Sequence, residues 1–310
     1  MIRELRIATR QSRLALWQAE YVADILRRAH PGIEIEVIPM STRGDEVLDR
    51  SLAKIGGKGL FIKELEVAML EDRADIAVHS MKDVPWDMPK GMMIGAVLQR
   101  ADPGDALASA GGIDALDALP ENARVGTSSL RRQSQMRFIR PDLVIEPVRG
   151  NVETRLRKLD EGDFHAVVLA AAGLKRLGLG ERITGRLSYD ECLPAVGQGA
   201  IGIECRTDKE EVRAALKAVE HENSRRCVDA ERSFAATLEA SCESPVAAYA
   251  EIRENELYLR GMVANPEGTR LMRMELRGSQ SDGRRIGNDL ARQLLANGAG
   301  ELLEEIKAQS

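Results

Sequence analysis

Arginine side chains recur just after segments that the sequence pattern predicts as strands. Arg131 and Arg132 follow a Thr-Ser-Ser triplet (127–129) at a predicted strand-to-helix turn, and Arg149 and Arg155 follow the next strand. Helix N–H groups, hydroxyl caps and guanidinium groups together bind carboxylates or phosphates. The repetition favours a ligand with several anionic groups. The alternative is a set of solvated helix faces, on which the arginines only keep the surface polar.

The rest of the sequence argues against two common classes of polyanionic ligand, nucleic acids and nucleotide phosphates. The chain has a net charge of −5 and a pI near 5.6, and only 3% of its residues are aromatic, so bases would have little to stack on. No G-x-x-x-x-G-K-[ST] loop or G-x-G-x-x-G fingerprint occurs. We therefore expect no nucleic-acid partner, and a local site for a small molecule that carries several carboxylates.

A lysine and an aspartate, Lys82 and Asp83, directly follow an apolar predicted strand, ADIAVHS. Adjacent opposite charges are common on surfaces, so the pair by itself is more often structural than catalytic, although its position after an apolar strand favours a role in a site. His79, in the same segment, is as compatible with a hydrogen-bonded core histidine as with a functional one. We assign His79 no role.

The four cysteines, at positions 192, 205, 227 and 242, are widely spaced and form no C-x-x-C pair. This spacing argues against a structural zinc site or a redox dithiol, so we expect free thiols and no metal. Cys242 lies in a turn of short residues, EASCESP, whereas the other three resemble packing residues. A lone cysteine in such a turn is by itself weak evidence of covalent chemistry.

The elements that position these residues alternate between strand and helix. LRIATR, IEIEVIP and ADIAVHS are predicted strands of a first α/β series, and ARVGT, LVIEPVRG and HAVVLAAAG begin a second one. Within the first predicted helix, Leu14, Trp17, Tyr21 and Ile25 share one face. The repeated strand-then-helix order predicts mainly parallel sheets, whose sites gather where strands end and helices begin.

Three further segments bear on the organisation of the chain. The glycine-rich stretch 44–59 is either a mobile lid over a site or an ordinary surface loop. RADPGDAL, at 100–107, is a predicted crossover between domains. The last third contains a helical stretch, the strands ELYLRGMV and RLMRMELRG, and a last helix over 290–309, which predicts an α+β domain.

The chain length of 310 residues exceeds what one core usually supports, so we expect two or three domains. No apolar run of about 18 residues occurs, and residues 1–9 contain no signal-peptide core. We therefore expect a cytoplasmic protein that does not bind membranes.

Seven segments, in order and over essentially the whole chain, resemble the hydroxymethylbilane synthase (porphobilinogen deaminase) family. They are ATRQSRLALWQ, GKGLFIKELE, AVHSMKDVP, VGTSSLRRQ, RGNVETRLRKL, AAAGLKRLG and LPAVGQGAIGIE. The resemblance implies two α/β domains like type II periplasmic binding proteins, with a discontinuous chain path, and a smaller C-terminal α+β domain. The expected domains are 1–99 with 200–218, then 100–199, then 219–310.

The resemblance implies a transferase of tetrapyrrole and haem biosynthesis. Such an enzyme deaminates four porphobilinogen molecules, condenses them head to tail on a covalent dipyrromethane primer, and releases hydroxymethylbilane by hydrolysis. The primer would be joined to Cys242 through a thioether. The family also suggests a monomer whose product passes to uroporphyrinogen-III synthase.

The family pattern also implies a role for individual residues of this chain. Asp83 aligns with the catalytic carboxylate and Lys82 lies beside it. Besides these two and Cys242, the aligned cofactor-binding residues are Ser129, Arg131, Arg132, Arg149 and Arg155. The aligned substrate-binding residues are Arg10, Ser12, Phe61, Arg149, Arg155, Arg176 and Gln198.

The cofactor loop departs from the family pattern. Ala240 and Ser241 precede Cys242 and Ser244 precedes Pro245, where the family commonly has a glycine and a branched apolar residue, respectively. Alanine restricts the backbone more than glycine does, so the conformation of this loop is open.

Two other classes of protein compete with the enzyme. One is a non-catalytic protein that uses the same two-lobed architecture to bind a carboxylated ligand and needs no covalent adduct. The other, a nucleic-acid-binding module, has less support. Lys82 with Asp83, the arginines and Cys242 together favour the enzyme.

Overall fold

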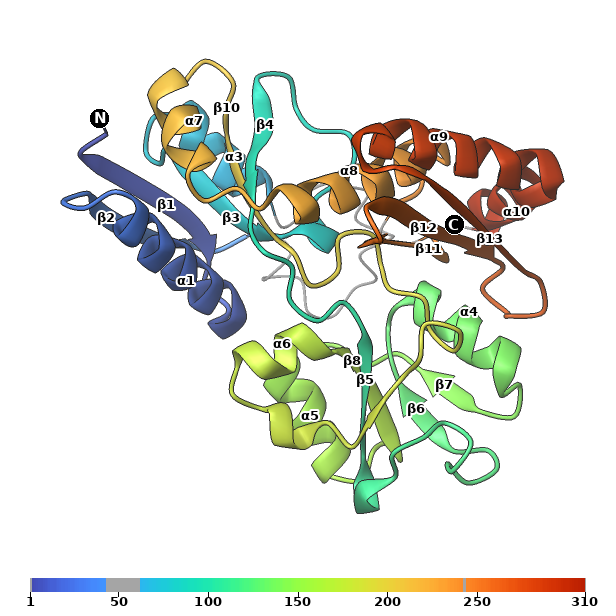
Figure 1. Ribbon diagram of the computed structural model, residues 1–310. Coiled ribbons are helices and arrows are strands. Elements are labelled where there is room, and N and C mark those ends of the chain that lie inside the picture. Colours follow the sequence, from blue (N-terminus) through green and yellow to red (C-terminus); the bar gives the residue numbers. More distant parts are fainter. Residues whose placement is uncertain (1, 43–61, 242–243, 310) are drawn as a thin grey trace. The chain divides into compact units, whose positions relative to one another are not determined.

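The computed structural model describes residues 2–42, 62–241 and 244–309 (Figure 1). The candidate lid 44–59, Phe61 and Cys242 therefore lie outside the described residues. Contacts divide the chain into two compact units. Unit 1 comprises Met1–Ala101 and Ala200–Arg225, and unit 2 comprises Asp102–Gly199 and Arg226–Ser310. The three-domain boundaries stay a prediction. None of the described helices is long and apolar enough to cross a membrane.

Unit 1 contains a five-stranded sheet of order β2-β1-β3-β10-β4. Strand β1 is parallel to β2 and β3, whereas β10 is antiparallel to both of its neighbours. The elements of this unit are β1 (Glu4–Arg10), α1 (Arg13–Ala29), β2 (Glu34–Met40), α3 (Lys63–Leu70), β3 (Ile76–Ser80), β4 (Met92–Val97), β10 (Ile201–Arg206) and α7 (Glu210–Lys217).

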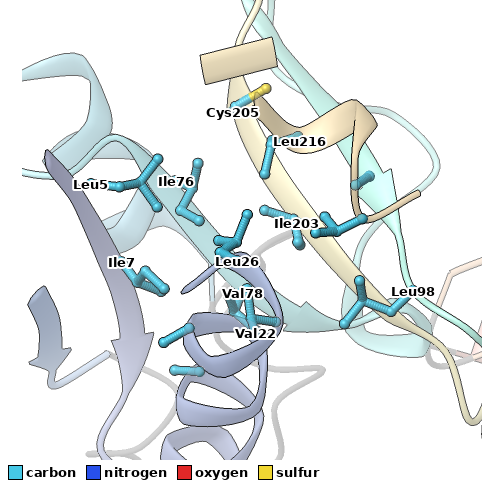
Figure 2. Close-up of a cluster of buried hydrophobic side chains, with 14 of the residues drawn as sticks. Leu5, Ile7, Val22, Leu26, Ile76, Val78, Leu98, Ile203, Cys205 and Leu216 are labelled. Atoms are coloured by element: carbon cyan, nitrogen blue, oxygen red, sulfur yellow. The ribbon is translucent and has the colours of Figure 1, made fainter. Parts of the chain in front are cut away.

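Helix α1 packs on this sheet through a face that the sequence pattern did not single out. Its buried residues include Ala19, Val22, Ala23 and Leu26, and Val22 and Leu26 meet Leu5, Ile7, Ile76 and Val78 of the sheet in the core shown in Figure 2. The two alanines allow close approach of helix and sheet. Trp17 and Tyr21 instead stack on each other, 36% and 39% exposed.

The first sheet of unit 2 has the corresponding order, β7-β6-β8-β5-β9. Here β6 is parallel to β7 and β8, and β5 is antiparallel to β8 and β9. The elements are β5 (Asp105–Ser109), β6 (Arg124–Gly126), α4 (Leu130–Ile139), β7 (Val144–Glu146), α5 (Val152–Asp160), β8 (Ala166–Ala170), α6 (Ala171–Arg176) and β9 (Gly185–Arg186).

Both sheets therefore correct the prediction of mainly parallel pairing. In each sheet, the strand with two antiparallel neighbours is the first one after the chain has crossed from the other unit: β5 after Ala101 and β10 after Gly199. A strand that enters from the opposite end of a sheet must run against its neighbours. The repeated order and the crossings after Ala101 and Gly199 are those of a type II periplasmic-binding-protein fold, as expected.

The C-terminal part of unit 2 is α+β, as predicted. An antiparallel sheet of order β11-β12-β13 packs against helices, and Gly261 of β12 lies so close to Phe234 of α8 that no larger residue fits there. The last helix begins earlier than predicted, at Gly283, and is interrupted near Gly298, whose φ is +103°. The elements are α8 (Glu222–Thr237), whose first four residues belong to unit 1, β11 (Val246–Arg253), β12 (Glu256–Ala264), β13 (Leu271–Ser279), α9 (Gly283–Leu294) and α10 (Gly300–Gln309).

Candidate active site

In unit 1, the candidate residues lie at the carboxyl ends of two adjacent parallel strands. Arg10 is the last residue of β1, and β3 leads into a 3-10 turn, Met81–Asp83. Lys82 is half-buried, whereas Asp83 is exposed. Within the described part of the chain, the Asp83 carboxylate makes no hydrogen bond or ion pair. It is therefore available to a ligand. Ser12 accepts a hydrogen bond from Ala15 N as the N-cap of α1.

Hydrogen bonds to neighbouring elements fix the backbone that leads into the turn with Lys82 and Asp83. Gln18 Nε2 of α1 donates a 2.8 Å hydrogen bond to Ser80 Oγ, at the end of β3. His79 Nε2 lies 2.8 Å from Glu204 Oε2 of β10, and both side chains are buried. Met81 N donates to Ala200 O. His79 is thus a hydrogen-bonded core residue that fixes β3 to β10.

Gly202 of β10 gives Met81 the space that it needs. A Cβ atom at position 202 would lie 2.1 Å from Met81 Sδ. We expect Gly202→Ala to displace Met81 and the following turn, because a packed core resists added volume. Overpacking typically destabilises a protein by about 1–3 kcal/mol, and we expect turnover to fall with it.

Thermal unfolding and steady-state kinetics measure these effects. Gly180→Ala is the matched control, because its Cβ would contact nothing within 4 Å. An unchanged melting temperature and turnover in Gly202→Ala would show that the turn tolerates the displacement.

In unit 2, candidate residues also follow the carboxyl ends of parallel strands. Ser129 is the N-cap of α4, directly after β6, and its side chain makes no capping hydrogen bond. The first turn of α4 contains no acidic residue. Among the described residues, nothing accepts a hydrogen bond from the backbone N–H of Leu130 or Arg131. The start of α4 is therefore open to an anion.

Arg149 lies in the turn between β7 and α5, and Arg155 lies in the first turns of α5. Gly150 has a φ of +99°, and a Cβ there would lie 2.7 Å from the Thr154 side chain, so the turn requires glycine. Asn151 caps α5 by accepting a hydrogen bond from Thr154 N. Arg155 Nε donates to Gly150 O at 2.9 Å. The turn thus fixes the backbone beside both arginines.

Two other predicted substrate-binding residues contact the chain near its crossings. Arg176 Nη2 donates a 2.8 Å hydrogen bond to Gly199 O. Gln198 is buried, and its Nε2 donates to Pro103 O at 2.6 Å and to Asp105 Oδ1 at 2.9 Å. Both residues therefore support the backbone, and substrate binding by them stays a prediction.

Asp105 is a residue of this site that the sequence reasoning missed. It is fully buried at the start of β5, where its carboxylate lies between the guanidinium groups of Arg131 and Arg132, at 2.8 and 2.7 Å. Burial opposes ionisation of Asp105, but the two guanidinium groups outweigh burial and hold the pKa of Asp105 well below its usual value. Breaking a buried ion pair typically costs about 3–5 kcal/mol.

The two arginines at Asp105 differ in the donors that they have left. Arg132 directs Nε and Nη2 to Asp105 and Nη1 to Val168 O. Arg131 uses only Nη1, which donates to Leu193 O and faces Asp105. Nothing in the described part of the chain accepts a hydrogen bond from Arg131 Nε or Nη2. That edge of the guanidinium can bind a carboxylate.

The buried group formed by Asp105, Arg131, Arg132 and Cys192 carries an excess positive charge. Two guanidinium cations oppose one carboxylate, and burial, together with the Asp105 charge, raises the pKa of the adjacent Cys192 thiol to about 12, so the thiol stays neutral. One positive charge is therefore uncompensated within this group. Cys192, Cys205 and Cys227 are all free and buried, as predicted.

Comparison with known proteins gives two matches to family models. Residues 5–214 match the dipyrromethane cofactor binding domain of porphobilinogen deaminase, and residues 225–296 match the C-terminal domain of porphobilinogen deaminase. Together the matches include the segments with Lys82, Asp83 and every candidate arginine, and also Cys242.

Solved structures that resemble the chain are distant. A TRAP periplasmic solute binding protein from Desulfovibrio salexigens is 13% identical over 72% of this chain and 74% of its own, with a TM-score of 0.44. A putative methionine-binding lipoprotein from Bacillus subtilis is 13% identical over 72% of this chain and 92% of its own, with a TM-score of 0.42. At this level of similarity, these structures say nothing about the ligand.

Proposed function

The chain belongs to the porphobilinogen deaminase family, and from this premise we propose that Cys242 carries its cofactor, that Asp83 is its catalytic carboxylate, and that the arginines bind carboxylates of cofactor and substrate. The family activity is that of hydroxymethylbilane synthase, a transferase of tetrapyrrole biosynthesis that takes porphobilinogen as substrate. Its cofactor is dipyrromethane, which supplies the carbon to which the first substrate unit is joined.

The described residues fit a group that bears several carboxylates. The observation that carries this proposal is the uncompensated positive charge at Arg131 and Arg132, beside the open N-terminus of α4. Each pyrrole ring brings an acetate and a propionate, and planar guanidinium groups bind such carboxylates through two parallel hydrogen bonds. Arg149 and Arg155 extend the cationic surface at the next strand end.

Asp83 is suited to stabilise a positive charge that forms on the substrate. Loss of ammonia from porphobilinogen leaves a cation, and an anion that faces this cation lowers the barrier to its formation. The Asp83 carboxylate is exposed and makes no interaction within the described residues. The hydrogen bonds of Gln18 and His79 fix the end of β3 that precedes it. Asp83 can also accept hydrogen bonds from pyrrole N–H groups.

We expect Arg149→Leu to impair cofactor assembly or elongation without unfolding the protein. The change removes one charged hydrogen-bond donor group from the site, and a charge-assisted hydrogen bond contributes about 1.5–3 kcal/mol, or roughly 10- to 150-fold in binding. Cofactor content by mass spectrometry and turnover measure the effect.

The matched control for this variant is Arg157→Leu, because Arg157 is exposed on α5, the helix that follows Arg149, and pairs with Glu161. We expect the control to retain its cofactor. Full cofactor content and normal turnover in Arg149→Leu would remove Arg149 from the site.

The intact mass of the denatured protein, with peptide mapping around Cys242, tests the proposed function. We expect an added mass of two linked pyrroles on Cys242. If the purified chain is unmodified, it is offered porphobilinogen, and we then expect this adduct together with release of ammonia. A chain that acquires no adduct and releases no ammonia would instead be a non-catalytic binding protein.

We also propose that the protein is a cytoplasmic monomer that passes its product to uroporphyrinogen-III synthase. The free thiols of the three described cysteines support a reducing compartment. Sedimentation of the purified protein tests the monomer. Cell fractionation tests the location. A coupled assay, with and without the synthase, tests transfer of the product.

A further inference from the structure

Four side chains of unit 2 converge on one carboxylate. Asp105 Oδ1 accepts hydrogen bonds from Arg132 Nε at 3.1 Å, Arg132 Nη2 at 2.7 Å and Gln198 Nε2 at 2.9 Å. Its Oδ2 lies 2.8 Å from Arg131 Nη1 and accepts a hydrogen bond from Cys192 Sγ at 3.2 Å. All five side chains are buried. Packing and these hydrogen bonds together restrict the orientation of each guanidinium.

We propose that Asp105 is a positioning residue, which orients Arg131 so that its Nε and Nη2 edge faces one carboxylate of the ligand. This inference rests on the proposed function, in which Arg131 and Arg132 bind carboxylates of the pyrroles. Asp105 acts through the arginines and needs no contact with the ligand itself.

The charge of the group indicates how many carboxylates it takes. Arg131, Arg132 and Asp105 carry a net charge of one positive unit, and Cys192 and Gln198 add none. One ligand carboxylate neutralises the group, whereas a second one would leave an uncompensated anion at a buried site. We infer that Arg131 binds a single acetate or propionate.

Gln198 connects this group to the first two chain crossings. The chain enters unit 2 at Asp102 and leaves it at Gly199. Gln198 lies one residue before the second crossing, and its Nε2 binds both Asp105 Oδ1 and Pro103 O, beside the first crossing. The orientation of the arginines is therefore linked to the backbone at the first two of the three points where the chain changes units.

Asp105→Asn in the full chain tests the proposal. The amide can still accept a hydrogen bond but no longer balances the charge of two guanidinium groups. We expect fewer molecules to carry dipyrromethane and, in those that do, a KM for porphobilinogen raised by about 10- to 100-fold with a smaller loss in kcat, as for small misplacements of binding groups. A purely structural role would lower the melting temperature but leave the KM of the loaded enzyme unchanged.

Asp102→Asn is the matched control. Asp102 lies three residues before Asp105 and pairs with Lys175 and Arg186, which are not part of the buried group. We expect this variant to load its cofactor and to retain its KM. If Asp102→Asn loses as much cofactor as Asp105→Asn and its KM rises by the same factor, the effect is a general one and the proposal is wrong.

Gln198→Met tests the positioning role of Asp105 if Asp105→Asn does not fold. It removes the hydrogen bonds of Gln198 Nε2 to Asp105 Oδ1 and Pro103 O and leaves the charge of the group unchanged. We expect a folded protein whose KM rises by a factor of a few, the equivalent of about 1 kcal/mol for one hydrogen bond. Unchanged cofactor content and KM would overturn the proposal.

Arg131→Leu separates this inference from the proposed function. If Arg131→Leu loads and binds normally, Arg131 does not bind a ligand carboxylate and the assignment of the arginines fails. If Arg131→Leu is impaired while folded Asp105→Asn behaves like the parent protein, the arginine assignment holds and the positioning role of Asp105 fails.

Discussion

Cys242→Ser is expected to abolish turnover and to leave the chain at its unmodified mass. A thiolate is a strong nucleophile near neutral pH, whereas a serine hydroxyl is not, so the thioether to the cofactor cannot form. Without the covalently attached cofactor, the substrate has no bound pyrrole to which it can be joined. Because effective concentrations of well-oriented tethered groups reach about 10⁵ M or more, we expect a loss exceeding about a thousandfold.

Intact mass and ammonia release after addition of porphobilinogen measure this result. Cys227→Ala is the control, since Cys227 is a buried free thiol of α8 and should keep its mass adduct at Cys242. A Cys242→Ser protein that still carried two pyrroles would place the cofactor elsewhere. The outcome also tests whether Ala240 and Ser241 permit attachment.

Asp83→Asn is expected to keep the cofactor and to lose about three powers of ten in turnover. At an effective dielectric near 20, a charge pair 4 Å apart is stabilised by about 4 kcal/mol, and each 1.36 kcal/mol of barrier is a factor of ten in rate. The asparagine has nearly the same shape but lacks the charge. We therefore expect the loss in kcat rather than in KM.

Single-turnover and steady-state kinetics, with cofactor content determined on the same sample, measure this effect. Asp24→Asn is the control, because Asp24 is an exposed carboxylate of the same unit that pairs only with Arg27 among the interactions described here. Near-normal turnover in Asp83→Asn would remove Asp83 from the catalytic role. Loss of the cofactor in this variant would indicate a role in assembly instead.

The sequence by itself determined the local elements and the chemistry. Strand and helix periods are local properties, so β1, α1, β2 and β3 appear where the pattern predicts them. The spacing of the arginines at strand ends predicted a ligand with several carboxylates. For these arginines to lie at one edge of the sheet, only the strands that precede them need to be parallel, as β6, β7 and β8 are. The family motifs, which the family models confirm, supplied the activity and the cofactor.

Only the tertiary structure decided which strands pair, which face of α1 packs on the sheet and how the charges of Arg131 and Arg132 are compensated. Strands β5 and β10 are antiparallel to their neighbours because the chain enters from the other unit, which no local pattern encodes. Trp17 and Tyr21 share a helical face, but the close packing of Ala19 and Ala23 turns that face outward.

Asp105 illustrates the same limit at the site. In the sequence it is one acid in a crossover segment, 27 residues from Arg132 and 93 from Gln198. Burial of a charge is tolerated only when partners compensate it, and these partners meet Asp105 only in the folded chain. The residue types thus predict that carboxylates are bound, whereas long-range packing determines which guanidinium edge is left without an acceptor in the described part of the chain.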